Sequence, residues 1–232
     1  MSDAANHTRG ALLNAAERLF SSRGYAAVGI REIADQAGAN VASISYHFGS
    51  KHDLYLATVR RAMSRHAGEE AVEMLADPGQ SREAAAVQLV RFIRLFFVTI
   101  AERPEMEPCG LLLLREALHP SEAIEAVVRD YLQPRTRDLV GLIHVIMPDA
   151  TPAELRRYSE LLFGQLLYYR VFRPFIERLG NLDLSDPDTA GEIGERIAVF
   201  TLRGLGFGEE FITRALADGA EAGLTPSGGT EQ

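Results

Sequence analysis

The stretch of sequence that decides the fold runs from Ile30 to Lys51 and reads Ile-Arg-Glu-Ile-Ala-Asp-Gln-Ala-Gly-Ala-Asn-Val-Ala-Ser-Ile-Ser-Tyr-His-Phe-Gly-Ser-Lys. Apolar residues recur at helical spacing as far as Ala37, and Gly38 can adopt the left-handed backbone that ends a helix. Asn40 belongs to the residue types that cap helix N-termini, so a second, short helix is expected directly after it. The stretch is therefore predicted to form a helix-turn-helix.

The second of these helices is predicted to have two different sides. Ile44 and Phe48 lie four residues apart, which places them on one edge of a helix. The opposite side is small, polar and aromatic, and its residues are Ala42, Ser43, Ser45, Tyr46 and His47. A helix with one apolar edge and such an outer face suits a groove of DNA.

The size and composition of the chain indicate a globular protein. It has 232 residues, of which 47% are hydrophobic, so a buried core in one or two domains is expected and disorder is not. The N-terminus has no apolar run of the secretory kind, and runs such as Leu111 to Leu114 are too short to span a bilayer. We therefore expect a cytoplasmic protein without membrane contact.

The single cysteine excludes a disulfide framework and a cysteine-based zinc cluster. Cys109 is expected to be a small buried hydrophobe rather than a redox sensor, because reactivity needs an accessible, electropositive setting. Cys109, Glu116, His119 and His144 do not have the spacing of a metal site, so neither a metal nor another cofactor is predicted.

The charge is distributed unevenly along the chain. Residues 1–66 carry eight Lys or Arg against five Asp or Glu, a formal charge of +3, whereas the whole chain has −8 and the remainder therefore −11. A mildly basic head on an acidic body directs phosphate attraction to the head.

Two further helices are predicted to flank the helix-turn-helix. The first runs from Thr8 to Arg23 after a loose arm of residues 1–7. The second starts at Ser50, an N-cap residue with Asp53 three positions later, and continues toward Leu75. Lys51 then stands at a helix N-terminus, where its ammonium and the free backbone N–H groups can face one phosphate.

The rest of the chain is also predicted to be helical. After the turn at 77–79, helices are expected at 81–102, 109–118, 121–147 with a kink near Leu132 before Pro134, 152–179, and around Ile193 to Phe200. The predicted fold class is all-α, with a three-helix helix-turn-helix domain followed by a helical-bundle ligand-binding and dimerisation domain. The expected boundaries are 1–50, 51–218 and a disordered tail at 219–232.

The segment from Gly10 to Leu56 closely resembles the DNA-binding domain of the TetR/AcrR family of bacterial transcriptional regulators. The residues that carry the resemblance are Ala16, Leu19-Phe20, Gly24-Tyr25, Ile33-Ala34, Ala37-Gly38, Ile44, Tyr46-His47-Phe48, Ser50-Lys51 and Leu54. Beyond this segment the chain is similar to the family only in architecture.

The resemblance implies a homodimer whose two heads enter successive major grooves of a pseudo-palindromic operator. The residues that match the family's DNA-contacting positions are Val41, Ala42, Ser43, Ser45, Tyr46, His47 and Lys51. The chain departs from the family at two positions: many members have Ser or Thr in place of Gly29, and many have Tyr in place of Ser45.

Polar residues among the apolar positions of the second domain are candidates for the lining of an effector pocket. The selected residues are Arg115, Glu116, His119, Gln165, Tyr168, Tyr169 and Arg173. The alternative is that they form internal ion pairs and helix caps, as buried charges usually do.

The last two long helices are expected to have more apolar surface than one subunit can cover. Gly164, Gly191 and Gly194 would let helices approach closely, so pairing with a second copy as a four-helix bundle is predicted.

The expected function is that of a ligand-responsive transcriptional repressor, released from a palindromic operator by a small molecule, and not an enzyme. Two alternatives stay open. One is a transcriptional activator or architectural DNA-binding protein controlled by a protein partner, without an effector. The other is a helical enzyme or small-molecule binder with a vestigial head.

Overall fold

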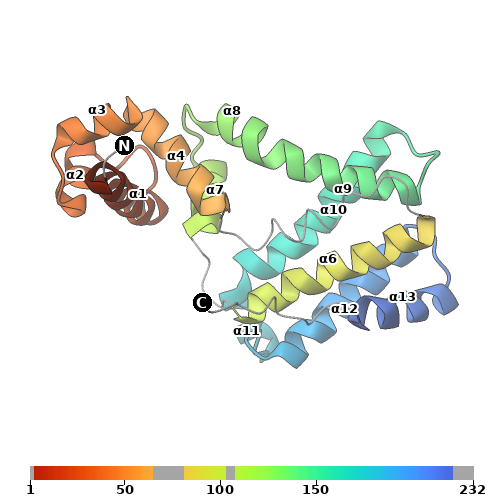
Figure 1. The fold of residues 1–232 in the computed structure, drawn as a ribbon. Helices are drawn as coiled ribbons and strands as arrows, with labels where there is room; N and C mark the ends of the chain where they lie inside the picture. The colour runs from red at the N-terminus through yellow and green to blue at the C-terminus, as the bar shows by residue number, and fades with distance from the viewer. Residues whose placement is uncertain (1–2, 65–80, 103–107, 222–232) are drawn as a thin grey trace. The chain divides into compact units, whose positions relative to one another are not determined.

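The computed structural model describes residues 3–64, 81–102 and 108–221, and within these ranges all regular structure is helical, with no strand (Figure 1). The all-α prediction is confirmed. In chain order the elements are α1 (Asp3–Arg23), α2 (Ile30–Ala37), α3 (Val41–Phe48), α4 (Lys51–Ser64), α6 (Arg82–Glu102), α7 (Pro108–Leu118), α8 (Ile124–Val127), the π-helical segment η1 (Val128–Leu132), α9 (Gln133–Ile146), α10 (Pro152–Val171), α11 (Arg173–Gly180), α12 (Pro187–Gly204) and α13 (Glu209–Glu221).

The chain divides into two compact units. The first comprises Met1–His66 together with Glu105–Pro134, and the second comprises Ala67–Pro104 together with Arg135–Gln232. This division differs from the predicted boundary after residue 50, because α4, α7 and α8 pack with the N-terminal helices. The functional division at residues 50 and 218 stays a prediction.

The first unit has its own hydrophobic core. Buried side chains from α1, α2, α3 and α4 meet those of α7 and α8, and they include Leu12, Phe20, Ile33, Ile44, Leu54, Tyr55, Leu112, Ala123 and Val127. Such packing supplies most of the stability of short helices, which are marginal by themselves. The helices expected to flank the helix-turn-helix are therefore fixed by a shared core.

Helix α1 starts earlier than predicted. It begins at Asp3, so the prediction of a loose arm is wrong for residues 3–7. Nothing between Asp3 and Thr8 breaks a helix, and alanine, which occupies two of these positions, has the highest helix propensity. Three other predictions lie outside the described residues. They are the extension of the helix from Ser50 to Leu75, the turn at 77–79 and the tail from 222.

The second unit is built around α6. Both sides of this helix are buried, with Leu89, Ile93 and Phe97 fully inaccessible, so the helix predicted at 81–102 is the core helix of the unit. By length and composition α6 could cross a membrane, and half of its most apolar window is buried inside the unit. The sequence argument that no apolar segment could span a bilayer was therefore too strict, and packing on several sides accounts for the apolar composition of α6.

A π-helical segment lies where the sequence predicts a kink, near Leu132. The helical run that starts with α8 passes through η1, which ends at Leu132, and continues as α9. Pro134 lacks a backbone N–H and cannot donate in a regular helix, which is consistent with irregular bonding just before it.

The predicted helix at 152–179 is two helices. Thr151 and Glu154 form a reciprocal capping box at the start of α10, and Pro152 occupies the first helical position. The helix ends at Val171, and α11 starts at Arg173 with Pro174 in its first turn. The helix that the sequence predicts as continuous from 152 to 179 is therefore broken at Phe172, with Pro174 in the first turn after the break.

Helix α13 was not predicted. It extends to Glu221, so the expectation of a disordered tail from Gly219 is wrong for residues 219–221. Gly219 is buried, and a Cβ atom there would lie 2.7 Å from a methyl group of Val90. Contact with α6 therefore holds the end of α13, which the polar sequence around it does not reveal.

Candidate DNA-binding site

The turn between α2 and α3 has the backbone geometry that the sequence predicts. Gly38 has φ 64° and ψ 31°, in the left-handed region, and it ends α2. The Asn40 side chain then accepts a hydrogen bond of 2.9 Å from the backbone N–H of Ala42 and caps α3. Gly49, with φ 86°, ends α3 after two turns. The helix-turn-helix is confirmed.

Helix α3 buries one edge and exposes the other. Ile44 is 1% exposed in the core of the unit, whereas the Tyr46 side chain is 80% exposed. Ala42 and Ser45 are also exposed, and Ser43 and His47 are half-buried. A tyrosine is seldom left this accessible without a partner, because most of its surface is apolar.

Val41 differs from the other predicted DNA contacts. It is half-buried and packs against the core of the first unit, so less of its surface is available to a groove. The rings of Tyr46 and His47 lie 4.9 Å apart at an interplanar angle of 79°. The accessible face of α3 is therefore centred on Ala42, Ser45 and Tyr46, with His47 beside it.

Gly29 caps α2 without a side-chain hydrogen bond. Its φ of −92° and ψ of 149° are extended, a conformation open to any residue. The backbone at position 29 would therefore accept serine or threonine as well, and its conformation does not require a glycine.

Lys51 stands at the start of α4, as predicted, and its ammonium lies 4.3 Å from the centre of the Tyr25 ring. Partial burial lowers the pKa of this lysine, while the negative charge of Glu122 acts in the opposite direction. Ser50 accepts a hydrogen bond of 3.1 Å from the Asp53 N–H and donates one of 2.6 Å to the Asp53 carboxylate. The phosphate role of Lys51 stays a prediction.

Arg9 is a candidate DNA contact that sequence reasoning missed. Its guanidinium lies 5.2 Å from the centre of the Phe48 ring, at the end of α3, and the residue is exposed. The sequence places Arg9 far from α3 along the chain, and only the packing of α1 brings the two together. Its positive charge beside α3 suits a phosphate.

Three of the proposed effector contacts belong to the first unit. Arg115 donates a hydrogen bond of 2.6 Å to the carbonyl oxygen of Ser21, and the buried Glu116 carboxylate accepts one of 2.9 Å from the Tyr55 hydroxyl. His119 is exposed. Arg115 and Glu116 thus have the structural contacts that were the alternative to ligand binding.

The other four proposed effector contacts belong to the second unit. Arg173 is buried and bonded to three partners, which are the Glu177 carboxylate at 2.9 Å, the Ile100 carbonyl at 2.8 Å and the Ser185 hydroxyl at 2.9 Å. Tyr169 packs against Phe97 with ring centres 5.4 Å apart. Tyr168 is exposed and Gln165 is half-buried. Arg173 is therefore occupied internally, and the structure divides the seven residues between two units.

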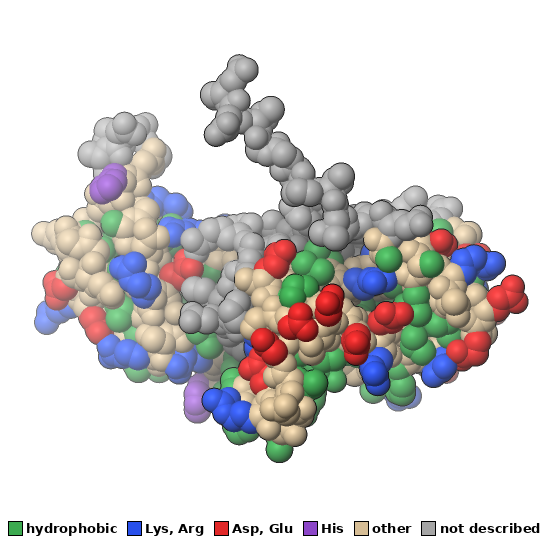
Figure 2. All heavy atoms as spheres, turned by 90° about the horizontal axis from the view of Figure 1, so that it is seen from below, with side chains coloured by type: hydrophobic (Ala, Val, Ile, Leu, Met, Phe, Trp, Pro, Cys, Tyr) green, Lys and Arg blue, Asp and Glu red, His purple; other side chains and the backbone are tan. Residues whose placement is uncertain are grey.

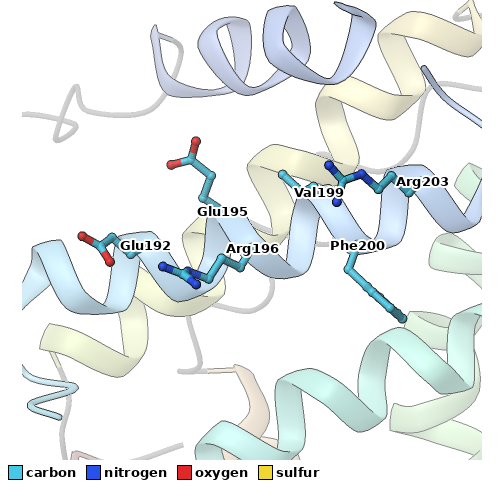
Figure 3. A pocket seen from close by; sticks show the side chains of 6 residues that line it. All are labelled: Glu192, Glu195, Arg196, Val199, Phe200 and Arg203. Atoms are coloured by element: carbon cyan, nitrogen blue, oxygen red, sulfur yellow. The ribbon is translucent and has the colours of Figure 1, made fainter. Parts of the chain in front are cut away.

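A groove of about 650 Å³ follows one side of α12 (Figure 3). Its lining comes from that helix alone and consists of Glu192, Glu195, Arg196, Val199, Phe200 and Arg203. In Figure 3 the Glu195 and Phe200 side chains point apart, at the two edges of this lining. A small-molecule pocket normally encloses its ligand between several elements, so this groove resembles a surface for another helix more than an effector site.

The charge expected from the sequence is visible on the surface. On the face in Figure 2, acidic side chains gather over the second unit, and hydrophobic side chains lie among them. The formal charge of residues 1–66 is +3 within a chain of −8. An anionic body is unsuited to DNA, so DNA contact is expected on residues 1–66, the N-terminal part of the first unit.

A capped helix-turn-helix with an accessible aromatic and polar face, carried on a helical core, defines a DNA-binding transcriptional regulator. Two family profiles match the chain. The profile described as "Bacterial regulatory proteins, tetR family" matches residues 12–58, and "HTH-type transcriptional dual regulator CecR, C-terminal domain" matches residues 85–205. The chain belongs to the TetR family, as the resemblance in its sequence indicated.

Several known proteins are similar to this chain. The dual regulator CecR of Shigella flexneri is 31% identical over 148 residues, which cover 61% of this chain and 66% of CecR, just under two thirds of that regulator. The repressor NicS of Pseudomonas putida is 28% identical over 210 residues, which cover 87% of this chain and 93% of NicS.

The fold is also that of solved regulators. The structure of NalD, the secondary repressor of the MexAB-OprM multidrug efflux pump in Pseudomonas aeruginosa, has a TM-score of 0.56 at 19% identity and covers 88% of this chain and 98% of NalD. At that identity the likeness concerns the fold. The relatives are transcriptional regulators and not enzymes.

Proposed function

We propose that this protein is a homodimeric, ligand-responsive transcriptional repressor that works in the cytoplasm. It binds a palindromic operator through α3 and is released from it by a small-molecule effector. The observation that carries the proposal is the accessible face of α3, with Tyr46 80% exposed beside His47. In this proposal the groove-facing residues are Val41, Ala42, Ser43, Ser45, Tyr46 and His47, and Lys51 contacts phosphate.

The exposed apolar side chains of α10, α11 and α12 support dimerisation. They include Leu161, Phe172 and Phe175, together with Phe200. Monomeric proteins seldom expose so many large apolar residues on neighbouring turns. A second copy would cover this surface and form the four-helix bundle expected from the sequence.

The glycines contribute to this proposal unequally. Gly164 and Gly191 have open space where a Cβ atom would lie, so they are free for close approach by a partner helix. Gly194 is different, because a Cβ atom there would meet Phe97 of the same chain at 3.0 Å. Its close packing serves the contact between α12 and α6 within one subunit.

The proposed effector binds the second unit and favours a dimer whose heads no longer match the operator, since a ligand shifts an equilibrium only through different affinities for the two states. The proposed contacts are reduced to Gln165, Tyr168 and Tyr169, because Arg115, Glu116 and Arg173 are bonded internally and His119 belongs to the first unit. In this proposal α4 carries the effect of the ligand to the DNA-binding residues of α3.

The experiment that tests the proposal is the selection of genomic DNA fragments by the purified protein. We expect enrichment of fragments that share an inverted repeat, with half-sites about one helical turn apart. Retention of DNA without any shared sequence would contradict the operator model.

The effector is tested on the selected operator. Metabolites related to the genes beside the operator are screened for a rise in unfolding temperature and for release of DNA. A compound that raises the unfolding temperature and leaves operator affinity unchanged would contradict its role as an inducer.

The alternative is an activator or architectural protein controlled by a protein partner. The naming of CecR as a dual regulator shows that a relative can act in both directions. Transcription in vitro from a promoter beside the selected operator distinguishes a repressor from an activator, because a repressor lowers the yield of transcript and an activator raises it.

A further inference from the structure

The helix α7 and the turn that follows it lie outside the helix-turn-helix in sequence and inside the first unit in space. Leu112 of α7 and Ala123 of the following turn are fully buried in the same core as Phe20 and Tyr55. This packing sets the place of α7 only approximately, because apolar contacts are not directional. Directional contacts between α7 and the N-terminal helices are polar.

The first of these contacts caps α1. Arg115 donates from Nε to the carbonyl oxygen of Ser21 at 2.6 Å and from a second nitrogen to the carbonyl oxygen of Ser22. The last carbonyl groups of a helix have no partner within it, so a guanidinium satisfies them.

The second contact joins α7 to α4 through a buried carboxylate. Glu116 is 4% exposed, and its Oε2 accepts a hydrogen bond of 2.9 Å from the hydroxyl of Tyr55, which is itself buried. Its Oε1 accepts two more from Ser121, one from the backbone N–H at 2.8 Å and one from the hydroxyl at 2.9 Å. The carboxylate therefore links α7, the turn after it and α4.

Tyr55 connects this carboxylate to the start of α4. Its ring lies 5.0 Å from that of Tyr25, and the Lys51 ammonium lies 4.3 Å from the same Tyr25 ring. Lys51 and Tyr55 are four residues apart, so they lie on one side of α4. The hydrogen bond from Tyr55 thus limits rotation of α4 about its axis at the turn that carries Lys51.

A buried carboxylate is an expensive way to hold two helices together. An apolar residue of similar volume is often as stabilising, and buried ionic groups are retained in some proteins because they select one arrangement. The Glu116 carboxylate accepts three hydrogen bonds with fixed directions, and these favour one arrangement of α7, the turn after it and α4.

We propose that Glu116 is a positioning residue for operator binding: through Tyr55 it sets the orientation of α4, and so the positions of Lys51 and of α3, which precedes α4. The inference rests on the proposed DNA-binding function. Glu116 does not contact DNA in this arrangement, and its effect on the operator passes through α4.

The test compares Tyr55→Phe with Ser121→Ala, because each removes a hydroxyl that donates to Glu116 and only the first joins it to α4. Tyr158→Phe, a half-buried tyrosine of the second unit, is the control for loss of a phenol hydroxyl. Affinity for the selected operator and for unrelated DNA is measured well below the unfolding temperature, and thermal unfolding is recorded for each variant.

We expect Tyr55→Phe to weaken operator binding about tenfold, the equivalent of one lost hydrogen bond to a charged group. Binding to unrelated DNA should weaken less, because the Lys51 phosphate contact is common to both kinds of DNA and the base contacts of α3 are made only on the operator. Ser121→Ala is expected to lower the unfolding temperature and keep operator affinity within about twofold of the wild type. In the Tyr55→Phe, Glu116→Gln double variant the loss should stay near tenfold, because both changes act on one contact.

Equal operator affinity in Tyr55→Phe and wild type would overturn the inference, and so would equal losses in Tyr55→Phe and Ser121→Ala. If Glu116→Gln does not fold, the comparison of Tyr55→Phe with Ser121→Ala decides by itself. Failure of the wild type to select any operator would instead refute the proposed function.

Discussion

At the scale of single residues, α3 presents an exposed tyrosine and the start of α4 presents a positive charge. Tyr46 is 80% exposed on α3, and Lys51 begins α4 with its ammonium beside Tyr25. Contacts of this kind position a protein on DNA through phosphate, while base edges specify the sequence. The two residues are therefore expected to differ in what their replacement does to binding.

Replacing Lys51 by alanine should weaken binding to all DNA sequences alike. Each lost phosphate contact reduces the dependence of log affinity on log salt, here by about 1 per head. Titrations of operator and unrelated DNA at several salt concentrations measure both effects. Arg157→Ala, at an exposed position of α10, is the control. An unchanged salt dependence in Lys51→Ala would show that the lysine does not meet phosphate.

The tyrosine beside Lys51 makes the first unit sensitive to high pH. Burial, together with a hydrogen bond to Glu122, raises the pKa of Tyr25 to about 12. The unfolded chain loses this proton near pH 10, so the contribution of Tyr25 to stability is complete below about pH 10 and is lost as the pH rises toward 12.

Lys51, with its lowered pKa, acts in the opposite direction over the same range. Urea unfolding of the wild type and of Tyr25→Phe is measured between pH 8.5 and 11, in steps of about half a pH unit. The comparison separates the contribution of Tyr25 from that of Lys51. A smaller loss of stability with rising pH is expected in Tyr25→Phe. Identical pH profiles would exclude the role of Tyr25.

At the scale of elements, the second unit depends on the contact between α6 and α12. Gly194 of α12 faces Phe97 of α6, which is fully buried and packs edge-on against both Phe96 and Tyr169. An aromatic ring held on two sides has little room to move.

Gly194→Ala should therefore destabilise the protein by about 1–3 kcal/mol, as overpacking of a core usually does. The added Cβ atom would lie 3.0 Å from a ring carbon of Phe97. Gly141→Ala is the matched control, because no atom lies within 4 Å of its added Cβ and alanine favours a helix by roughly 0.5–1 kcal/mol. Denaturant unfolding measures both. Equal stability of Gly194→Ala and Gly141→Ala would contradict this account of the helix crossing.

At the scale of the whole molecule, the exposed apolar side chains of the second unit make the oligomeric state the decisive property. Leu161 of α10 is 64% exposed and Phe200 of α12 is 67% exposed. Burial of a side chain of this size stabilises the buried state by about 1.5–3 kcal/mol. A second copy of the chain is the partner that the operator model requires.

A charge at these positions should prevent dimerisation. Sedimentation of the Leu161→Glu, Phe200→Glu variant is expected to give the mass of one 25.5 kDa chain, whereas the wild type is expected to give twice that mass. Operator affinity should fall on the order of a hundredfold, since two linked heads bind more tightly than one. Leu118→Glu, which replaces an equally exposed residue of the first unit, should remain dimeric. A wild type that sediments as a monomer would refute the proposed assembly.

Sequence reasoning succeeded where structure depends on neighbouring residues. Gly38 in a left-handed conformation and Asn40 as a helix cap follow from residue type alone. It failed at α13 and at the end of α10, where packing decides which polar segments are helical. The effector contacts are the hardest to predict from sequence. In the sequence Arg115, Glu116 and Arg173 look like any isolated polar residues among apolar ones, whether they bind a ligand or bond internally.

The amino-acid sequence by itself determined the helix-turn-helix, the family and the accessible face of α3, because caps, glycine turns and helical periodicity act over a few residues of chain. The tertiary structure alone decided that Glu116 bonds to Tyr55, 61 residues earlier, and that Arg115 caps α1, 94 residues before it. Contacts between residues so far apart along the chain form only when the core packs, so local patterns in the sequence do not predict them.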